Sequence, residues 1–332
     1  MGGELRILTF CRHESYLRSL VRTGHRWDVV PRSPAFAEQP WVLARALPPN
    51  ARAISWPRGR TQLERGAYDL VVAHSPQDLA DASVSQTPMV AVFHDHPALH
   101  QALGTPKAAV EHVVERAAPA AVVYVSDGKR RAWGWPGEVI APGFAEAEAP
   151  PYHGDQAGIL LVSNLLCEAP EITGYRWLDG IGAGLPLLVY GVNPAVPGSC
   201  RPLPDPLTFA RQHLRVFLNV ANPGFYDNWT PAMLDAMAAG MPVVTRPFEG
   251  GPIVDGLNGL VGADAGRLRL ALLEMLDDAD RARALGEAAR QTIRERYPLD
   301  RFLAAWRRVL TSVSATHAVQ HAASAFRLPS SA

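Results

Sequence analysis

The sequence has few cysteines, no excess of either charge and little lysine. The three cysteines, Cys11, Cys167 and Cys200, are an odd number and show no Cys-x-x-Cys spacing. This argues against a disulfide framework or a zinc ribbon and favours a reducing, cytoplasmic compartment. Basic and acidic residues number 32 each. The balance argues against a protein that coats nucleic acid or docks through a polybasic surface, so no nucleic-acid partner is expected.

Long apolar runs are also missing. The run from Leu5 to Phe10 ends before Arg12 and is too short for the apolar core of a signal peptide. No window approaches the roughly 18 apolar residues that a membrane-spanning helix needs. The chain has 332 residues, of which 48% are hydrophobic and 19% charged. This composition is globular, and the length suggests two domains.

Short apolar runs alternate with longer amphipathic stretches along the chain. Most of the runs lack polar alternation, which is typical of parallel strands covered on both faces. The alternation predicts an α/β fold with parallel sheets. Strands are expected at Arg6–Phe10, Trp27–Val30, Leu70–Ala73, Met89–Phe93, Ala121–Val125, Ile159–Val162, Leu187–Tyr190, Val216–Asn219, Pro242–Thr245 and Gly259–Val261. Helices are expected at Ser15–Thr23, Pro76–Ser83, Lys107–Ala117, Gly174–Ala183, Pro206–His213, Pro231–Ala239, Arg267–Asp277, Asp280–Arg296 and Asp300–Val313.

The alternation of apolar runs and amphipathic stretches weakens once, between Pro136 and Ala157, where prolines and small or acidic residues are concentrated. We therefore predict two doubly wound, Rossmann-like domains, residues 1–148 and 149–313. The tail at 314–332 carries no clear structural pattern. Ligands of such sheets bind at the carboxyl ends of the strands, which would here face an interdomain cleft.

The sharpest local motif runs from Asp227 to Gly240. Thr230 suits a helix N-cap, Pro231 the first helical position, and Gly240 the residue after the helix end. The amides and dipole at the start of this helix would form an anion site suited to phosphate. Asp227 precedes the cap, and Asp235 lies on the second turn. These two carboxylates either grip hydroxyls on both sides of a diphosphate or are the solvated acids of an ordinary capped helix.

An acid, seven residues, a second acid and then Ala-Met-Ala-Ala-Gly-Met-Pro-Val-Val resembles the signature of family 4 (group 1) glycosyltransferases, which are retaining enzymes of the GT-B fold. In that family both acids are glutamate. The resemblance implies that Asp227 contacts the donor sugar and that Asp235 binds the ribose hydroxyls. It also implies that the main-chain amides of Asn228, Trp229 and Thr230 hold the distal phosphate. The aspartates are each one methylene shorter, which changes their reach.

Other segments extend the resemblance. Phe248 to Gly251, followed by Val254 to Val261, is similar to the family's Gly-Gly and Val-x-Asp-Gly-x-Asn-Gly-Leu-Val run, though about two residues shorter. The resemblance implies that Gly250 and Gly251 let the backbone approach the donor closely, and an ordinary flexible turn is the alternative. The segment 268–310 resembles the C-terminal helices that cross back over the family's cleft, and 139–144 resembles its hinge.

His94 follows a strand that is similar to the family strand ending in Thr-x-His. The resemblance implies that His94 faces the donor sugar and takes part in catalysis, through a neutral or a charged imidazole that hydrogen-bonds a sugar hydroxyl. A purely local hydrogen-bonding role is the alternative. His96 and His100 nearby invite a metal interpretation, but their spacing fits no zinc signature. No metal or other cofactor is expected, since GT-B enzymes do not generally need one.

The family's Arg and Lys after the first strand of the second domain have no counterpart here. Ile159–Val162 leads into 163–168, and no basic residue occurs before Arg176. A leaving diphosphate needs positive charge, for which Arg12, Arg176 and Arg246 are candidates. We favour Arg246 because it follows a strand's carboxyl end.

The loop after the first strand stands where GT-B enzymes usually have a Gly-rich turn beside the donor phosphate and the acceptor. It is polar instead, from Cys11 to Tyr16. Ser15 suits the cap of the next helix, and Arg12 and His13 are candidates for the acceptor or phosphate side.

The resemblance therefore implies an enzyme that transfers a sugar from a UDP- or GDP-sugar to a glycan, lipid or small-molecule acceptor with retention. A non-catalytic nucleotide-sugar-binding homologue, a nucleotide-sugar epimerase and a metal-dependent hydrolase built on His94 stay open. The enzyme would be cytoplasmic, with a contact at the inner face of the membrane left open. Four tryptophans are candidates for sugar stacking, membrane contact or core packing: Trp41, Trp56, Trp133 and Trp135.

Overall fold

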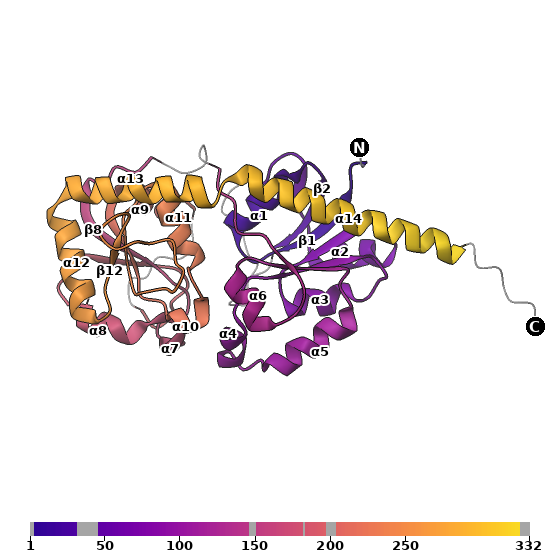
Figure 1. Ribbon diagram of the computed structural model, residues 1–332, viewed down its shortest axis with the longest axis horizontal. Helices are drawn as coiled ribbons and strands as arrows, with labels where there is room; N and C mark the ends of the chain where they lie inside the picture. The colour runs from indigo at the N-terminus through magenta and orange to yellow at the C-terminus, as the bar shows by residue number, and fades with distance from the viewer. Residues whose placement is uncertain (1–2, 32–45, 146–150, 182, 197–203, 326–332) are drawn as a thin grey trace, which may run out of the picture. The chain divides into compact units, whose positions relative to one another are not determined.

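The computed structural model describes residues 3–31, 46–145, 151–181, 183–196 and 204–325, without the side chains of 204–207 and 318–325. It shows the predicted α/β fold, with two units that each contain a parallel sheet (Figure 1). The first unit comprises the chain up to His94, Thr105–Gly143 and the chain from Asp300 onward. The second comprises Asp95–Gly104 and Phe144–Leu299.

The first unit has a seven-stranded sheet in the order β3-β2-β1-β4-β5-β6-β7, with every neighbouring pair parallel. Its strands are β1 (Arg6–Cys11), β2 (Arg26–Pro31), β3 (Ala51–Ala53), β4 (Leu70–Ala73), β5 (Met89–Phe93), β6 (Ala121–Tyr124) and β7 (Glu138–Val139). Its helices are α1 (Glu14–Leu20), α2 (Trp56–Glu64), α3 (Pro76–Ala82), α5 (Lys107–Ala117), α6 (Asp127–Trp133) and α14 (Leu299–Ala325), with a 3₁₀ turn at Val21–Thr23.

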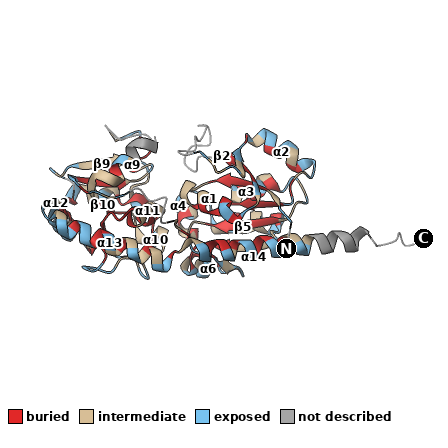
Figure 2. Ribbon diagram, turned by 90° about the horizontal axis from the view of Figure 1, so that it is seen from above, coloured by how far each residue is buried: buried red, intermediate tan, exposed pale blue. Residues whose placement is uncertain are grey.

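Strands β1, β4 and β5 are buried along their whole length, apart from the first residue of β1 (Figure 2). Burial on both faces explains why their sequences are unbroken apolar runs. The apolar core includes Trp133, with Trp56 and Trp135 packed against it. Core packing is therefore the role that the structure gives to these three tryptophans. Trp41 lies outside the described residues.

Helix α14 is longer than the sequence indicated, since it runs through part of the predicted tail to Ala325. From Asp300 onward it belongs to the first unit, whereas the sequence assigned residues 149–313 to the second domain. The reason is an apolar stripe of helical spacing that includes Phe302, Trp306 and Leu310. The Trp306 indole donates to the Tyr16 hydroxyl at 3.1 Å, which fastens α14 to α1.

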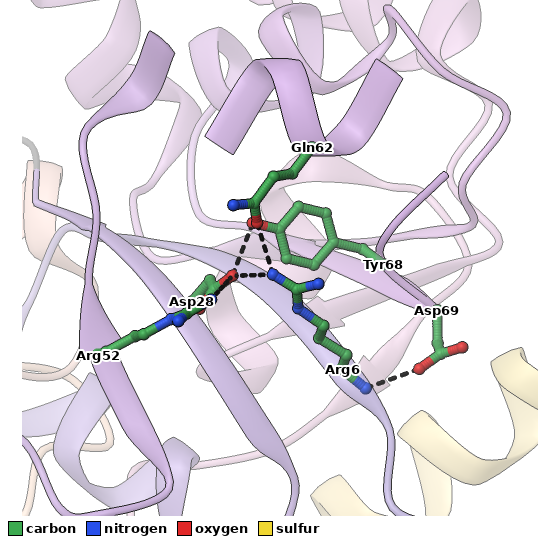
Figure 3. A network of polar contacts seen from close by, with 6 residues as sticks. All are labelled: Arg6, Asp28, Arg52, Gln62, Tyr68 and Asp69. Carbon is green, nitrogen blue, oxygen red and sulfur yellow. Dashed lines mark hydrogen bonds and ion pairs between the residues drawn. The ribbon is translucent and has the colours of Figure 1, made fainter. Parts of the chain in front are cut away.

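A buried carboxylate ties three strands of the first unit together (Figure 3). Asp28 on β2 accepts from Arg6 on β1 at 2.9 Å, from Arg52 on β3 at 2.5 Å and from the Tyr68 hydroxyl at 2.8 Å. The Gln62 amide oxygen accepts a further hydrogen bond from Arg6 and lies 2.8 Å from the Tyr68 hydroxyl. The Asp28 side chain is only 4% exposed. The network supplies the ion pairs and hydrogen bonds that a buried carboxylate needs.

The second unit has a five-stranded sheet in the order β12-β11-β10-β8-β9, again parallel throughout. Its strands are β8 (Gln156–Val162), β9 (Leu187–Tyr190), β10 (Leu214–Asn219), β11 (Val243–Thr245) and β12 (Leu260–Val261). Its helices are α4 (Pro97–Ala102), α7 (Pro170–Thr173), α8 (Leu178–Ile181), α9 (Pro204–His213), α10 (Pro223–Tyr226), α11 (Pro231–Ala239), α12 (Ala265–Asp277) and α13 (Ala279–Arg296), with a 3₁₀ turn at Tyr175–Trp177. Within the described residues, no helix combines the length and apolarity of a membrane span.

Helices α11 and α13 approach each other closely. A Cβ atom at Gly286 on α13 would lie 2.0 Å from the carbonyl oxygen of Gly240, directly after α11. Gly240 has a φ of +84°, the left-handed conformation that ends many helices. The close contact fixes the end of α11, and α11 then leads straight into β11.

Candidate functional site

Helix α11 begins as the motif predicts. Thr230 is the N-cap in an extended conformation, and its Oγ1 accepts from the Met233 amide at 3.3 Å. Pro231 follows, and the helix ends at Gly240. Because Pro231 has no N–H and the Met233 amide is used by the cap, Ala232 and the loop before the cap are left to bind an anion. The helix dipole adds to the attraction.

Asn219 joins three elements at the start of α11. It is the last residue of β10 and is 5% exposed. Its amide donates to Oγ1 of Thr245 at the end of β11, at 3.1 Å, and its Oδ1 accepts from Oγ1 of Thr230 at 3.4 Å. Asn219 therefore fixes the cap of α11 to the carboxyl edge of the sheet. The sequence did not indicate this role directly, although a polar residue that ends a buried apolar run was the available signal.

Asp227 has a backbone conformation that is costly for an aspartate. It follows α10, with φ at +68° and ψ at −113°. A non-glycine residue in such a sparsely populated region stores about 1–3 kcal/mol of strain. Strain of this kind persists where the surroundings impose it, and it concentrates at ligand and active sites. The strained backbone therefore makes Asp227 a candidate for binding a ligand through its carboxylate.

The glycine pair lies against the loop that carries Asp227. A Cβ at Gly251 would stand 2.9 Å from the Asn228 carbonyl oxygen, and Gly250 has a φ of +65°. A side chain at Gly251 would therefore need the neighbouring backbone to shift, and Gly250 has a conformation that glycine adopts without strain. Oδ1 of Asn228 is buried without a hydrogen-bond partner among the described residues. A pocket opens beside this contact and is lined by Met233, Thr245, Arg246, Phe248, Gly251, Pro252, Ile253 and Val261.

Asp235 forms an ion pair that the sequence did not indicate. Its carboxylate lies 3.2 Å from the guanidinium of Arg211 on α9, and both side chains are mostly buried. Any hydroxyl that binds Asp235 would share the carboxylate with Arg211. The partner was missed because residues 24 positions apart in the sequence meet only through the packing of α9 on α11.

Arg246 occupies the carboxyl end of β11, and its guanidinium lies 4.1 Å from the centre of the Trp177 ring. It also donates to the Val220 carbonyl at 3.5 Å. Burial lowers its pKa, but an arginine stays charged near neutral pH. Arg176 differs, because it is exposed and paired with the exposed Glu171 at 3.0 Å.

A second group of site residues lies in the first unit, which we call the histidine cluster: Thr9, His13, Tyr16, His74 and His94. His74 and His94 directly follow β4 and β5. Nδ1 of His74 lies 2.8 Å from Nε2 of His94, and Nε2 of His74 lies 3.0 Å from Oγ1 of Thr9. The two imidazoles stack at 5.1 Å, and the Tyr16 ring meets His94 edge-on at 4.7 Å.

Of this cluster, the sequence singled out only His13 and His94. His74 was missed, although it directly follows the predicted strand Leu70–Ala73. Because adjacent parallel strands end at the same edge, residues after β4 and β5 are expected to be neighbours. The pairing of His74 with His94 follows from that rule.

The histidine cluster is electrically neutral at His74 and His94. Burial lowers the pKa of His74 to about 3, with contributions from His13 and Arg12. Burial also lowers the pKa of His94 well below its usual value, assisted by His13, His74, Arg12 and Lys129. The lowered pKa favours a neutral imidazole at His94, which is one of the two forms that the sequence left open.

Arg12 and His13 lie at the end of β1. His13 is the N-cap residue of α1, and its ring lies 5.0 Å from that of His94. The prediction of Ser15 as the cap is wrong, because α1 begins at Glu14. A carboxylate in the first turn favours this earlier start through the helix dipole.

In the run from His94 to His100, the structure shows local contacts for two histidines. Nδ1 of His96 accepts from the Ala98 amide at 3.2 Å and caps α4. His100 lies 3.9 Å from Asp95. Across the described ranges, no group of three or more His, Cys, Asp or Glu side chains is placed to hold a metal ion.

Comparisons with known proteins give a fold but no family. No family model and no curated protein matches the chain. Solved structures do match over nearly its whole length. The sucrose-phosphate synthase of Thermosynechococcus elongatus shares 15% identity at a TM-score of 0.69, covering 94% of this chain and 100% of its own.

Two further structures agree. The Anabaena protein HepE, in complex with UDP and glucose, shares 13% identity at a TM-score of 0.70, covering 93% of this chain and 100% of its own. The lipopolysaccharide outer core galactosyltransferase WaaB shares 13% identity at a TM-score of 0.57, covering 93% and 99%. These are GT-B structures, and this chain has the same fold.

Proposed function

We propose that the chain is a glycosyltransferase that moves a sugar from a nucleoside diphosphate sugar, with UDP or GDP as the nucleotide, to an acceptor hydroxyl. The observation that carries the proposal is the start of α11. A capped helix end lies there between a strained carboxylate, Asp227, and a second one, Asp235. A neighbour of the same fold is described in complex with UDP and glucose, which supports a nucleotide sugar as the ligand.

The proposed roles follow from the charges. The loop 228–230 and the start of α11 bind the diphosphate through amides and the helix dipole. Arg246 supplies the positive charge for which the segment 163–168 has no Arg or Lys. Asp235 accepts from the ribose hydroxyls, and Asp227 accepts from the sugar. Gly250 and Gly251 let the backbone approach the donor.

We extend the proposal to a retaining reaction without a bound metal. The acceptor hydroxyl attacks the anomeric carbon on the face from which the diphosphate departs. The bond between that carbon and the phosphate oxygen breaks, and the departing phosphate takes the acceptor proton. The protein then contributes positioning and charge stabilisation and needs no strong base of its own. Acceptors in this proposal are a glycan, a lipid or a small molecule, with Arg12 and His13 on the acceptor or phosphate side.

The cellular setting belongs to the same proposal. Cys11 and Cys167 are free thiols, which suits a reducing compartment such as the cytoplasm. A lipid acceptor would bring the enzyme to the inner face of the membrane.

A non-catalytic nucleotide-sugar-binding protein is the second candidate. The missing Arg and Lys in the segment 163–168 favour it, because a leaving diphosphate is less stabilised without them. It differs from the enzyme in one property: it binds the nucleotide sugar and does not turn it over.

A thermal-shift screen of UDP- and GDP-sugars tests both candidates. A ligand that binds only the native state increases the free energy of unfolding, by about 2.7 kcal/mol at a ligand concentration of 100 times Kd. The melting temperature rises as a result. We expect a shift with one donor, reduced in Asp235→Asn and kept in Asp280→Asn, whose carboxylate is 92% exposed on α13. Release of UDP or GDP from that donor identifies an enzyme, whereas binding without release favours the second candidate. The absence of any shift across the panel would contradict both.

A further inference from the structure

The hydroxyl of Thr9 has one proton to donate, and its neighbours in the structure identify the atom that accepts it. Oγ1 of Thr9 lies 3.0 Å from the carbonyl oxygen of Val72, its register partner on β4. A carbonyl oxygen only accepts, so this contact uses the hydroxyl proton. Oγ1 also lies 3.0 Å from Nε2 of His74. With its proton committed, Oγ1 accepts there, and the proton between the two atoms belongs to Nε2 of His74.

The donor and acceptor atoms of His94 follow from those of His74. A neutral imidazole carries one N–H, and its other nitrogen accepts. With Nε2 of His74 protonated, Nδ1 of His74 is an acceptor. Nδ1 lies 2.8 Å from Nε2 of His94, so Nε2 of His94 donates. Nδ1 of His94 is then left with its lone pair, and no described residue hydrogen-bonds to it. His94 is partly exposed, whereas His74 is 4% exposed.

We infer that Thr9 and His74 are positioning residues that lock His94 in the Nε2–H tautomer, so that Nδ1 of His94 serves as a hydrogen-bond acceptor for a hydroxyl of a sugar substrate. This inference rests on the proposed function for its substrate, while the tautomer itself is a property of the unliganded chain. The low pKa of His74, about 3, supports the accounting, because it keeps the relay neutral near neutral pH. Asp78 adds order, since its carboxylate accepts from the His74 backbone amide at 3.1 Å.

The consequence for substrate choice is specific. A locked acceptor selects a group that donates, so a hydroxyl is bound at this position and its fluoro analogue is not. The other neighbours leave the assignment unchanged. Tyr16 meets both imidazoles with its ring edge, and its hydroxyl accepts from Trp306.

Nitrogen-15 NMR of the histidine-labelled full chain tests the relay without any substrate. Two-bond ¹⁵N–¹H correlations distinguish the two neutral tautomers. We expect Nε2–H at both His74 and His94 in the wild-type protein. Nδ1–H at His94 would overturn the inference, and this measurement needs no variant.

Thr9→Val and Thr9→Ser form the matched pair. Valine removes the acceptor of His74 Nε2–H at nearly constant volume, which frees His74 to donate from Nδ1 and shifts His94 toward Nδ1–H. Serine retains the hydroxyl and is expected to keep the wild-type spectrum. An unchanged His94 tautomer in a folded Thr9→Val protein would overturn the positioning role.

Kinetics adds the functional readout. We expect Thr9→Val to lower kcat about tenfold with little change in the donor KM, and Thr9→Ser to retain the rate. Equal rates in all three proteins would overturn the link to catalysis. If no nucleotide sugar is bound at all, the proposed function fails, and the NMR result still decides the tautomer.

Discussion

At the residue scale, Asp227 combines a carboxylate with a backbone conformation that suits glycine. Its φ of +68° was not visible in the sequence, where Asp227 stood out only through its spacing from Asp235. Local signals such as an acid before a cap are readable from the chain. The strain depends on how α10 and the start of α11 are held, which the order of residues does not reveal.

Replacement of Asp227 separates the strain from the chemistry. Asp227→Gly removes the side chain and the strain together, so we expect it to be more stable than Asp227→Ala by about 1 kcal/mol. Melting temperatures of the two variants measure the difference. If alanine is tolerated as well as glycine, the backbone at this position is not strained.

Asp28 gives a prediction for pH. Burial raises its pKa, but the hydrogen bonds from Arg52, Arg6 and Tyr68 outweigh burial and lower it overall. The unfolded carboxyl group has a pKa of about 3.9. The contribution of Asp28 to stability is therefore complete above that pH and is lost as the pH falls through the lower folded value.

We expect Asp28→Asn to lose about 2 kcal/mol of unfolding free energy at pH 7 and to show a smaller difference from wild type below pH 4. Urea unfolding at several pH values measures both. Asp127→Asn is a control, because Asp127 pairs with Arg130 and Arg131 on the surface and is expected to change little. A constant difference between Asp28→Asn and wild type at every pH would contradict the assignment.

At the element scale, the strands were predictable where both faces are buried. Leu70–Ala73 and Met89–Phe93 match β4 and β5 residue for residue, since an unbroken apolar run leaves few alternatives. The structure adds β3 and β7, two short edge strands whose residues are partly or wholly exposed. It also adds α2, α4, α6, α7 and α10, of which four are seven residues or shorter, too short for a helical repeat to be recognised.

The same contrast applies to the site. Helix α11 begins after Thr230 and ends before Gly240, as predicted, because helix capping depends on residues close together in the sequence. The links from Asn219 to Thr245, from Arg211 to Asp235 and from His74 to His94 join residues 20 or more positions apart. Only the fold brings such residues together.

Helix α11 depends on its cap. Thr230→Ala removes the side chain that binds both the Met233 amide and Asn219, so we expect a loss of about 1 kcal/mol in stability and weaker binding of UDP or GDP. Thr230→Ser retains the hydroxyl and should stay close to wild type in both. Chemical denaturation and isothermal titration provide the two values. Nucleotide affinity that is unaffected by Thr230→Ala would argue against an anion site at this helix end.

At the scale of the whole molecule, both sheets place site residues at the carboxyl ends of their strands. His74 follows β4 and His94 follows β5. Thr245 is the last residue of β11, and Arg246 comes directly after it. This is the edge at which parallel α/β sheets bind ligands. The alternating pattern of the sequence predicted the two sheets, but not the grouping of α14 with the first unit, which follows from the buried apolar stripe of that helix.

The candidate site residues are expected to act at different steps. We predict that Asp235→Ala raises the dissociation constant of the nucleotide, because a ribose contact is lost. Asp227→Ala and His94→Ala are expected to lower kcat mainly, because their contacts form with the reacting sugar. Titration and steady-state kinetics distinguish these effects. Unchanged kinetics in all three variants would refute the site.

The proposed sugar transfer requires that the start of α11 binds the diphosphate of a nucleotide. A crystal structure of the chain soaked with UDP or GDP tests it most directly. We expect phosphate density beside Asn228–Thr230 and Ala232, with the ribose at Asp235 and the Arg246 guanidinium turned toward the phosphates. A nucleotide bound elsewhere, or a helix end that stays empty at saturating nucleotide, would contradict it.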